Sequence, residues 1–310
     1  MLSRRNVRIK VMQLLYAQSR DGILKFEDLL RHYKRSIQGS YELFLFSLLQ
    51  MVRIAEYAKH DAATRKAKLL PNEADKAFKA ILADNELTAS IYNNQSFKQK
   101  TEQLRLIHRT EMDNARKIYA EFLKTEEYLA YIELAEYTTK DHETILLDLF
   151  KFCLKSDLYN DIVEDNYPLW TDDKSLVVGT IKKIIKALPA SERLFDEYLP
   201  NDETTEFGEE LLKIVLEEDQ MLLNIIEPVL KNWDAERVAI IDMILLKMAL
   251  VELLNFPTIP TKVTLNEFVE ISKLYSTDKS KDFINGILDR LMKQLIKEGK
   301  IQKEGRGLQS

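Results

Sequence analysis

Residues 234–257 read DAERVAIIDMILLKMALVELLNFP, and this stretch decides the fold class. Its apolar residues recur at the spacing of three and four that places side chains on one face of a helix. The positions that carry this pattern most clearly are Ile240, Ile244, Met248 and Val251. The pattern predicts an apolar helix over 234–255, which ends before Pro257 because proline cannot continue a helix.

The rest of the chain also has a helical pattern. There is no glycine from Ser40 to Val178 and no proline from Asn72 to Tyr167. Strand-rich proteins need frequent turns that contain these residues, so the fold class we expect is all-α. The helices predicted outside the opening stretch cover about 4–19, 25–38 (stopped at Gly39), several in 41–137 (with a break at Pro71), 141–165, 173–187, 191–198, one or two in 203–230, 261 or 264 to 275, and 277 or 278 to 298.

Composition and charge narrow the class of protein. The 310 residues include one cysteine, Cys153, and no apolar run that approaches the length of a membrane span. We expect a cytoplasmic protein in a reducing compartment. The net charge of −5 argues against a general nucleic-acid binder, but residues 1–35 hold nine Lys/Arg against three Asp/Glu, and residues 290–306 hold six against two. Two basic ends suggest a local anionic partner, although such variation also arises by chance.

The residues do not indicate catalysis. The four histidines are scattered without metal-ligand spacing, and neither a nucleotide-binding glycine loop nor a G-x-S-x-G motif occurs. Paired Glu-x-x-His motifs of a carboxylate-bridged metal site are also absent from the sequence. We therefore expect a protein that is not an enzyme, with no cofactor and no metal.

The first predicted helix has an unusual start. Ser3 is a plausible N-cap, and Arg4, Arg5 and Arg8 follow it in the sequence RRNVR. A helix N-terminus carries partial positive charge, so each cation there is unfavourable by about 0.3–1 kcal/mol. Arg8 is also a helical neighbour of the other two arginines, and like charges at this spacing repel.

Two segments resemble the NusB family of bacterial transcription antitermination factors. The first is RRNVRIKVMQLLYAQ, residues 4–18, where the family has Arg-Arg-x-x-Arg running into x-Gln-x-Leu-Tyr. The second, residues 232–291, holds Glu252-Leu253, a Pro-containing turn, Asn266-Glu267-x-Val269-Glu270 and Ser280-x-x-Phe283-Ile284-Asn285-Gly286-Ile287-Leu288-Asp289 in the family's order. The sequence departs from the family at Asp242-Met243-Ile244-Leu245-Leu246-Lys247, where Asp-Arg-x-x-Leu-Arg is common.

The resemblance implies a helical bundle of two small subdomains and no catalysis. It also implies binding to boxA-type single-stranded RNA, pairing with the ribosomal protein NusE, and indirect action on the RNA polymerase elongation complex. The residues that it suggests for RNA are Arg4, Arg5, Arg8, Gln13, Tyr16, Lys279, Lys281, Phe283 and Asn285. Those that it suggests for NusE are Glu252, Glu267 and Glu270.

Physical chemistry leaves two interpretations of these residues open. A phosphate at the start of helix 4–19 would offset the arginine repulsion and receive guanidinium and backbone N–H donors. Lys279 and Lys281 beside Phe283 similarly fit phosphates and a stacked base. The alternatives are a solvated basic end, a core position for Phe283 and Tyr16, and a packing role for Asn285-Gly286.

The resemblance leaves the middle of the chain unexplained. We expect residues 1–35 and 207–293 to form the NusB-like core, 36–206 an all-helical insertion, and 294–310 a flexible basic tail. Apolar clusters at 43–49 and 145–152 favour a folded insertion. A faint repeat, in which Trp170 corresponds to Trp233, leaves a duplication open. An alternative function is a non-catalytic protein–protein scaffold whose insertion carries the main partner surface.

Overall fold

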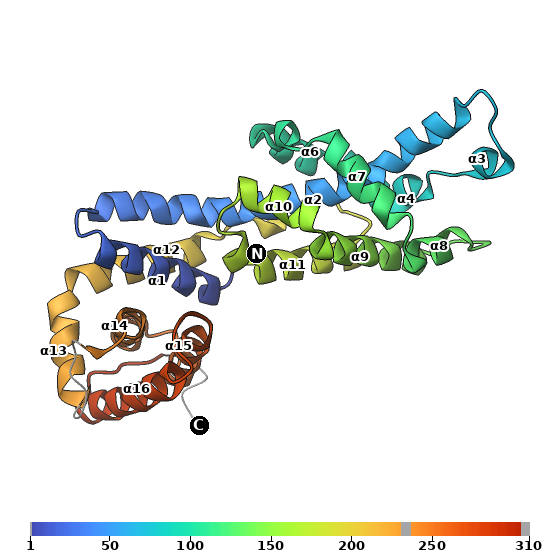
Figure 1. Cartoon of the computed structure of the whole chain (residues 1–310). Helices are drawn as coiled ribbons and strands as arrows, with labels where there is room; N and C mark the ends of the chain where they lie inside the picture. The colour runs from blue at the N-terminus through green and yellow to red at the C-terminus, as the bar shows by residue number, and fades with distance from the viewer. Residues whose placement is uncertain (1, 231–236, 305–310) are drawn as a thin grey trace. The chain divides into compact units, whose positions relative to one another are not determined.

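The computed structural model describes residues 2–230 and 237–304, and within them every regular element is a helix (Figure 1). The all-α prediction is therefore confirmed. The chain divides into two compact units. One, here called the split unit, consists of Leu2–Ile37 and Asn201–Ser310, and the other, the inserted unit, is Gln38–Pro200. The expected boundaries were 36 and 206. No described helix is both long and apolar enough to span a membrane.

The helices of the split unit come from both of its segments. The first segment contributes α1 (Arg4–Arg20) and the start of α2 (Phe26–Lys66). The second contributes α12 (Asp202–Glu217), α13 (Asp219–Leu230), α14 (Ile240–Asn255), α15 (Thr261–Tyr275) and α16 (Ser280–Lys297). The 203–230 segment is thus two helices, and the expected start of α14 at 234–236 lies outside the described residues, as does Trp233.

The predicted apolar helix is α14, and it is the centre of the split unit. It packs against α1, α12, α13, α15 and α16. Its buried residues include Ile244–Leu246 and Met248–Leu253, which cover most of the helix circumference. A helix that is apolar on nearly all sides must be surrounded, so the remaining helices form a layer around it.

The inserted unit has a separate hydrophobic core. Its helices are the rest of α2, α3 (Glu73–Ala77), α4 (Ile81–Asp84), α5 (Glu86–Asn93), α6 (Gln95–Gln103), η1 (Leu106–Arg109), α7 (Met112–Phe122), α8 (Glu126–Ile132), α9 (Thr139–Lys155), α10 (Asp157–Asn166), α11 (Trp170–Lys186) and η2 (Asp196–Tyr198). The expected 141–165 helix is divided at Ser156, whose side chain caps α10. Most of the expected 191–198 helix is not helical, and only η2 forms there.

The prediction that Gly39 stops the second helix is wrong. Helix α2 continues through Gly39 to Lys66. Glycine inside a helix costs about 1 kcal/mol relative to alanine, which packing of the neighbouring turns can offset. Ile37 and Tyr41 on either side of it are 3% and 1% exposed, and they belong to the cores of the split and inserted units respectively.

The prediction of a flexible tail over 294–310 does not fit the structure for residues 294–304, which have defined positions. Helix α16 includes Gln294 to Lys297. Lys303 Nζ then donates to the carbonyl oxygens of Glu252 (2.9 Å) and of Phe256 (2.8 Å), the C-cap residue of α14. Burial lowers the pKa of Lys303 to about 8. Residues 305–310 lie outside the described part of the chain.

Candidate functional site

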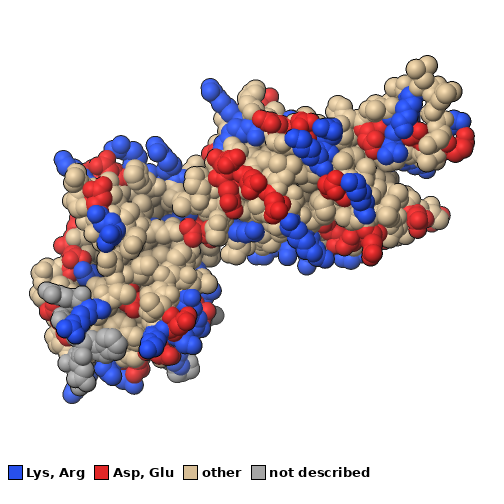
Figure 2. Space-filling model, viewed as in Figure 1, with Lys and Arg blue, Asp and Glu red and all other residues tan. Residues whose placement is uncertain are grey.

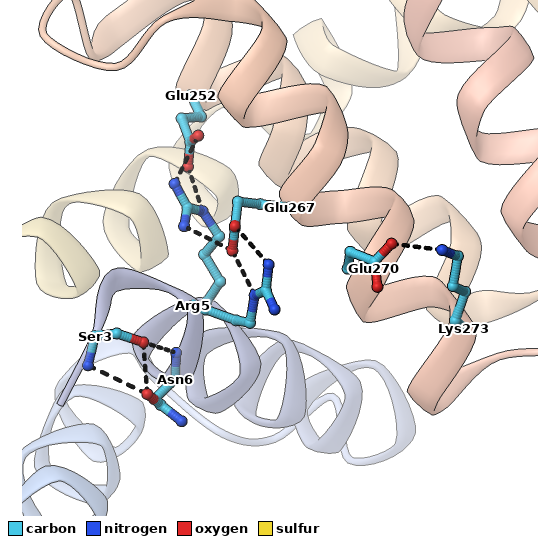
Figure 3. Close-up of polar contacts among 8 residues, drawn as sticks. Ser3, Arg5, Asn6, Glu252, Glu267, Glu270 and Lys273 are labelled. Atoms are coloured by element: carbon cyan, nitrogen blue, oxygen red, sulfur yellow. Dashed lines mark hydrogen bonds and ion pairs between the residues drawn. The ribbon is translucent and has the colours of Figure 1, made fainter. Parts of the chain in front are cut away.

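The start of α1 is capped as the sequence predicts. Ser3 Oγ accepts a hydrogen bond from the Asn6 backbone N–H (3.4 Å), and Asn6 Oδ1 accepts one from the Ser3 backbone N–H (3.2 Å; Figure 3). This reciprocal capping box satisfies two backbone donors. The helix therefore begins at Arg4 without any acidic residue in its first turn.

Carboxylates from the second chain segment face the arginines. Arg5 donates to both oxygens of Glu267 on α15, at 2.7 Å each (Figure 3). Arg4 pairs with Glu203 on α12 at 2.6 Å. The hydrogen bond from Arg5 holds the pKa of the Glu267 carboxyl below its usual value, although partial burial opposes this effect. The charge repulsion expected for an isolated helix start is therefore offset within the fold.

Arg8 and Glu252 form a buried ion pair, which corrects the roles predicted for both. Arg8 Nε and Nη2 lie 2.7 and 2.8 Å from the two oxygens of Glu252, and the two side chains are 2% and 0% exposed. Thr264 Oγ1 donates a third hydrogen bond to Glu252 (2.7 Å). The Arg8 guanidinium also lies 5.3 Å from the centre of the Phe207 ring. Neither Arg8 nor Glu252 presents a surface to RNA or to NusE in this structure.

An open hollow lies beside the exposed arginines. It has a volume of about 390 Å³ and is lined by Ser3, Arg4, Arg5, Arg8, Ile259, Pro260, Val263 and Glu267, of which Arg8 is only 2% exposed. Arg5 keeps a side-chain exposure of 45% and Arg4 of 38%, so both retain solvent-facing donors. An anion that enters this hollow would compete with the carboxylates for the two guanidinium groups.

A second hollow, of about 580 Å³, lies at the first turns of α14 and α16. We call it the α16 hollow. It is lined by Arg237, Val238, Ala239, Asp242, Thr277, Lys279, Ser280, Asp282, Phe283, Gly286, Ile287 and Arg290. Nothing lies within 4 Å of the position that a Cβ on Gly286 would occupy. Gly286 therefore widens the hollow beside Phe283, and the packing role considered for this glycine does not fit the structure.

A buried carboxylate fixes the wall of the α16 hollow. Asp242, on the first turn of α14, is 5% exposed and accepts hydrogen bonds from Ser276 Oγ (2.6 Å) and Ser280 Oγ (2.7 Å). Ser280 is the first residue of α16 and is itself 2% exposed. These bonds connect the N-terminal ends of two helices and brace the turn that carries the exposed Lys279. Phe283, one turn further on, is half-buried: it lines the hollow and also packs against the core of the split unit, so the core position considered for it is correct in part.

The remaining predicted residues lie in different surroundings. Lys281 and Asn285 are exposed on α16 but do not line the hollow. Gln13 is half-buried and Tyr16 is 40% exposed, both on α1. Glu270 pairs with Lys273 on the surface of α15 (Figure 3).

The sequence reasoning missed Arg237 and Arg290. Arg290 was detectable, because it lies seven residues after Phe283 and so occupies the same face of α16. Arg237 offered no comparable signal, since it precedes the periodic part of α14.

The described residues hold no group of three or more His, Cys, Asp or Glu side chains placed to bind a metal ion. Cys153 is fully buried, and burial raises the pKa of its thiol.

The fold around α14 to α16 is an all-helical bundle with a braced basic turn beside an aromatic ring. The sequence that forms this bundle matches a known family. The family model described as "NusB family" matches residues 174–293. Proteins named "Transcription antitermination protein NusB" are similar as well. The one from Salinibacter ruber is 42% identical over 113 residues (36% of this chain, 71% of the relative), and that from Geobacter sulfurreducens 38% over 115 residues (37% and 83%). The one from Chloroherpeton thalassium is 48% identical over 77 residues (25% and 36%).

The chain belongs to the NusB family, as its sequence motifs predicted. The matched segment contains the α16 hollow, Glu252 and Glu267, but it does not include α1. It begins inside α11 of the inserted unit rather than at 207. No solved structure gives a significant match.

Proposed function

We propose that this protein is a transcription antitermination factor that binds boxA-type single-stranded RNA together with NusE and acts through them on the RNA polymerase elongation complex. The curated relatives carry the name "Transcription antitermination protein NusB". The observation that carries the RNA part of the proposal is the α16 hollow, where Phe283 lies on a braced turn and the lining holds three cations, Arg237, Lys279 and Arg290, against two carboxylates, Asp242 and Asp282.

The α16 hollow suits a single strand. Lys279 and Arg290 supply cations for phosphates, and Phe283 supplies a ring on which an unpaired base stacks. The open space over Gly286 gives that base room. Unpaired bases expose their faces, whereas paired bases in an RNA helix do not, so this arrangement favours single-stranded RNA.

The arginine end of α1 supports a second contact. Of the three predicted arginines, Arg4 and Arg5 are exposed, and each is held by one carboxylate that a phosphate would have to displace. Asp242 and Glu252 lie ten residues apart on α14, which corresponds to about 15 Å along the helix. The two hollows are therefore close enough for one extended strand to reach both.

The NusE contact rests on the outer surface of α15. Glu270 is half-exposed and Glu267 is partly exposed, whereas Glu252 is excluded by its burial. Charge reversal by Glu270→Lys is therefore expected to weaken NusE binding and to leave RNA-only binding nearly unchanged. Unchanged affinity for NusE after this substitution would count against the assignment.

The test of the RNA proposal is a titration with a boxA-like RNA and a scrambled RNA, with and without NusE. Gly286→Leu fills the hollow beside Phe283 while replacing glycine with a better helix former, so RNA affinity falls and the fold is retained. Gly286→Ala is the matched control and adds one methyl group. Equal affinity of the Leu and Ala variants for the boxA-like RNA would contradict the proposal.

Salt dependence gives an independent measure. Arg8 is buried, and Arg290 joins the predicted set because it lines the α16 hollow, so five cations are available for phosphates: Arg4, Arg5, Lys279, Lys281 and Arg290. The slope of log K against log salt should then be no steeper than about −0.7 × 5, or roughly −3.5. A slope near zero would remove the electrostatic part of the proposal.

The inserted unit is, in this proposal, an accessory domain. The two hydrophobic cores share no residue among those described, and each unit has its own. Replacing residues 38–200 with a short Gly/Ser bridge should leave a folded protein that binds RNA, as circular dichroism, gel filtration and titration would measure. An insoluble product would instead indicate that the inserted helices complete the core. The scaffold alternative predicts a soluble product that does not bind RNA.

This function requires no catalysis and no cofactor, and it would place the protein in the bacterial cytoplasm, where transcripts are made.

A further inference from the structure

Two adjacent leucines are almost fully exposed in the inserted unit. Leu69 and Leu70, in the loop between α2 and α3, are 101% and 92% exposed. Single exposed apolar residues are common, but two large ones together at a loop tip are a feature of contact surfaces. They follow Lys66 and Lys68, so the segment is both basic and apolar.

This loop has a defined conformation. Lys68 Nζ lies 2.7 Å from Asp75 Oδ1, and Asn72 caps α3 through its hydrogen bond with the Asp75 backbone N–H (2.7 Å). Asp75 is 3% exposed, so it anchors both sides of the loop to α3. The two leucines are therefore presented in one arrangement, which lowers the entropy lost when they bind.

An apolar groove opens at the same end of the inserted unit. Its volume is about 470 Å³, and its lining is Arg65, Ala74, Ala77, Phe78, Lys79, Ile81, Leu123, Tyr128, Leu129, Ile132, Leu134, Ala135 and Tyr137. Arg65 and Ala74 flank the leucine loop in sequence, so the loop rises from one wall of the groove. The other lining residues come mainly from α8 and the residues after it. Figure 1 shows α3 and α8 at the same end of the inserted unit.

The segment that forms the second wall of the groove has exposed apolar residues, with acidic residues between them in sequence. Leu129, Ile132 and Leu134 are 46%, 39% and 38% exposed. Glu133 and Glu136 lie among them and are exposed. Within the described residues neither carboxylate has an ion-pair partner, and the same is true of Lys66. Glu133 and Glu136 therefore add two anions beside the α8 side of the groove, although Arg65 and Lys79 are in its lining, and Lys66 is the cation of the loop that can meet them.

We propose that the leucine loop of one copy docks into the groove of a second copy, and that the reciprocal contact forms at the same time. Loop and groove share one end of the unit, so a twofold axis there brings each loop opposite the partner copy's groove. The interface buries Leu69 and Leu70 twice and sets Lys66 against Glu133 and Glu136.

The occupant is a second copy because both halves of the interface are on this chain. The loop does not enter the groove of its own copy, since its leucines remain exposed. A different protein would have to supply a basic apolar segment for the groove and a separate apolar cover for the loop. A second copy supplies both, with matching charge.

Sedimentation velocity of the full-length protein over a wide concentration range tests the proposal. We expect a monomer–dimer equilibrium. The loop variant Leu69→Asp/Leu70→Asp and the groove variant Ile132→Asp/Leu134→Asp should each raise the dissociation constant at least about 100-fold, since each removes two symmetric contacts at once. Circular dichroism checks that the variants remain folded. Ile23→Asp, at an 86% exposed position in the split unit, is the matched control.

Mixing the two defective variants distinguishes a reciprocal interface from other dimers. The mixed dimer keeps one intact loop in one intact groove, so an equimolar mixture should dimerise more tightly than either variant alone. A protein that stays monomeric at every concentration overturns the proposal and leaves the groove to a different, basic partner. A dimer that the variants do not weaken, or a mixture that shows no restoration, overturns it as well.

Discussion

Glu252→Gln should destabilise the split unit more than any surface charge change. The side chain is fully buried and accepts three hydrogen bonds at 2.7–2.8 Å, two from Arg8 and one from Thr264. A glutamine of the same shape places an NH₂ group against one of these donors and removes the charge that compensates Arg8. Breaking a buried pair in this way costs about 3–5 kcal/mol. Glu267 Oε2 lies 3.6 Å from Arg8 Nη1 and still compensates part of its charge. We therefore expect a loss of about 3 kcal/mol in the free energy of unfolding.

Hydrogen exchange of the native protein is the appropriate assay. The chain has two units, so a single unfolding transition cannot be assumed, but exchange reports each helix separately. A loss of about 3 kcal/mol lowers the protection of α1 and α14 amides roughly 100-fold. Amides of α9, in the inserted unit, serve as an internal reference that should not change.

Glu270→Gln is the matched control. It makes the same chemical change at a half-exposed carboxylate whose partner, Lys273, is on the same helix. We expect a loss below about 0.5 kcal/mol. The reasoning is refuted if Glu252→Gln reduces α1 protection no more than Glu270→Gln does. In that case the buried pair adds no stability, and a loss of RNA binding in an Arg8 variant would have to be explained by direct contact.

Three further predictions follow from single contacts. The pair of Arg5 with Glu267 stabilises the fold above the ordinary carboxyl pKa, and this stability is lost as pH falls through the lowered pKa of Glu267. In unfolding experiments, the difference in stability between Arg5→Gln and the parent protein should therefore disappear in acid. Gly208→Ala overlaps a buried tyrosine and valine and should cost about 1–3 kcal/mol in thermal unfolding, whereas Gly179→Ala, in open space, should be neutral or stabilising. Cys153 should resist maleimide labelling until the inserted unit unfolds, because it is buried and its thiol pKa is raised; rapid labelling of the native protein would contradict the structure.

The helices were predictable where one local signal dominated. The apolar period of α14, the capping residue Ser3 and the break at Pro71 are each set by a few neighbouring residues, and all three occur in the structure. The stop at Gly39 failed because a weak local preference, of about 1 kcal/mol, was opposed by burial of the turns on both sides. That burial depends on two cores that are not visible in the local sequence.

The candidate site was predictable in part for the same reason. Lys279 and Phe283 line one hollow, as their adjacency suggested. Glu252 was misassigned because charged residues are exposed by default, and a glutamate becomes a core residue only when a cation meets it. That cation, Arg8, lies 244 positions away in the chain, so no rule about neighbouring residues could pair them.

The arginines that open α1 therefore have a structural role before any role in RNA binding. Each of the three is paired with a carboxylate of the second segment: Arg4 with Glu203, Arg5 with Glu267, and Arg8 with Glu252. These pairs join the two segments of the split unit, which the inserted unit separates in sequence. Since the entropy cost of closing a loop rises only slowly with its length, a modest set of contacts is enough to hold α1 in place across so long an insertion. A cationic helix start that is costly in isolation thus helps to join the two segments, and of the three arginines Arg4 and Arg5 are the ones whose side chains stay exposed to solvent.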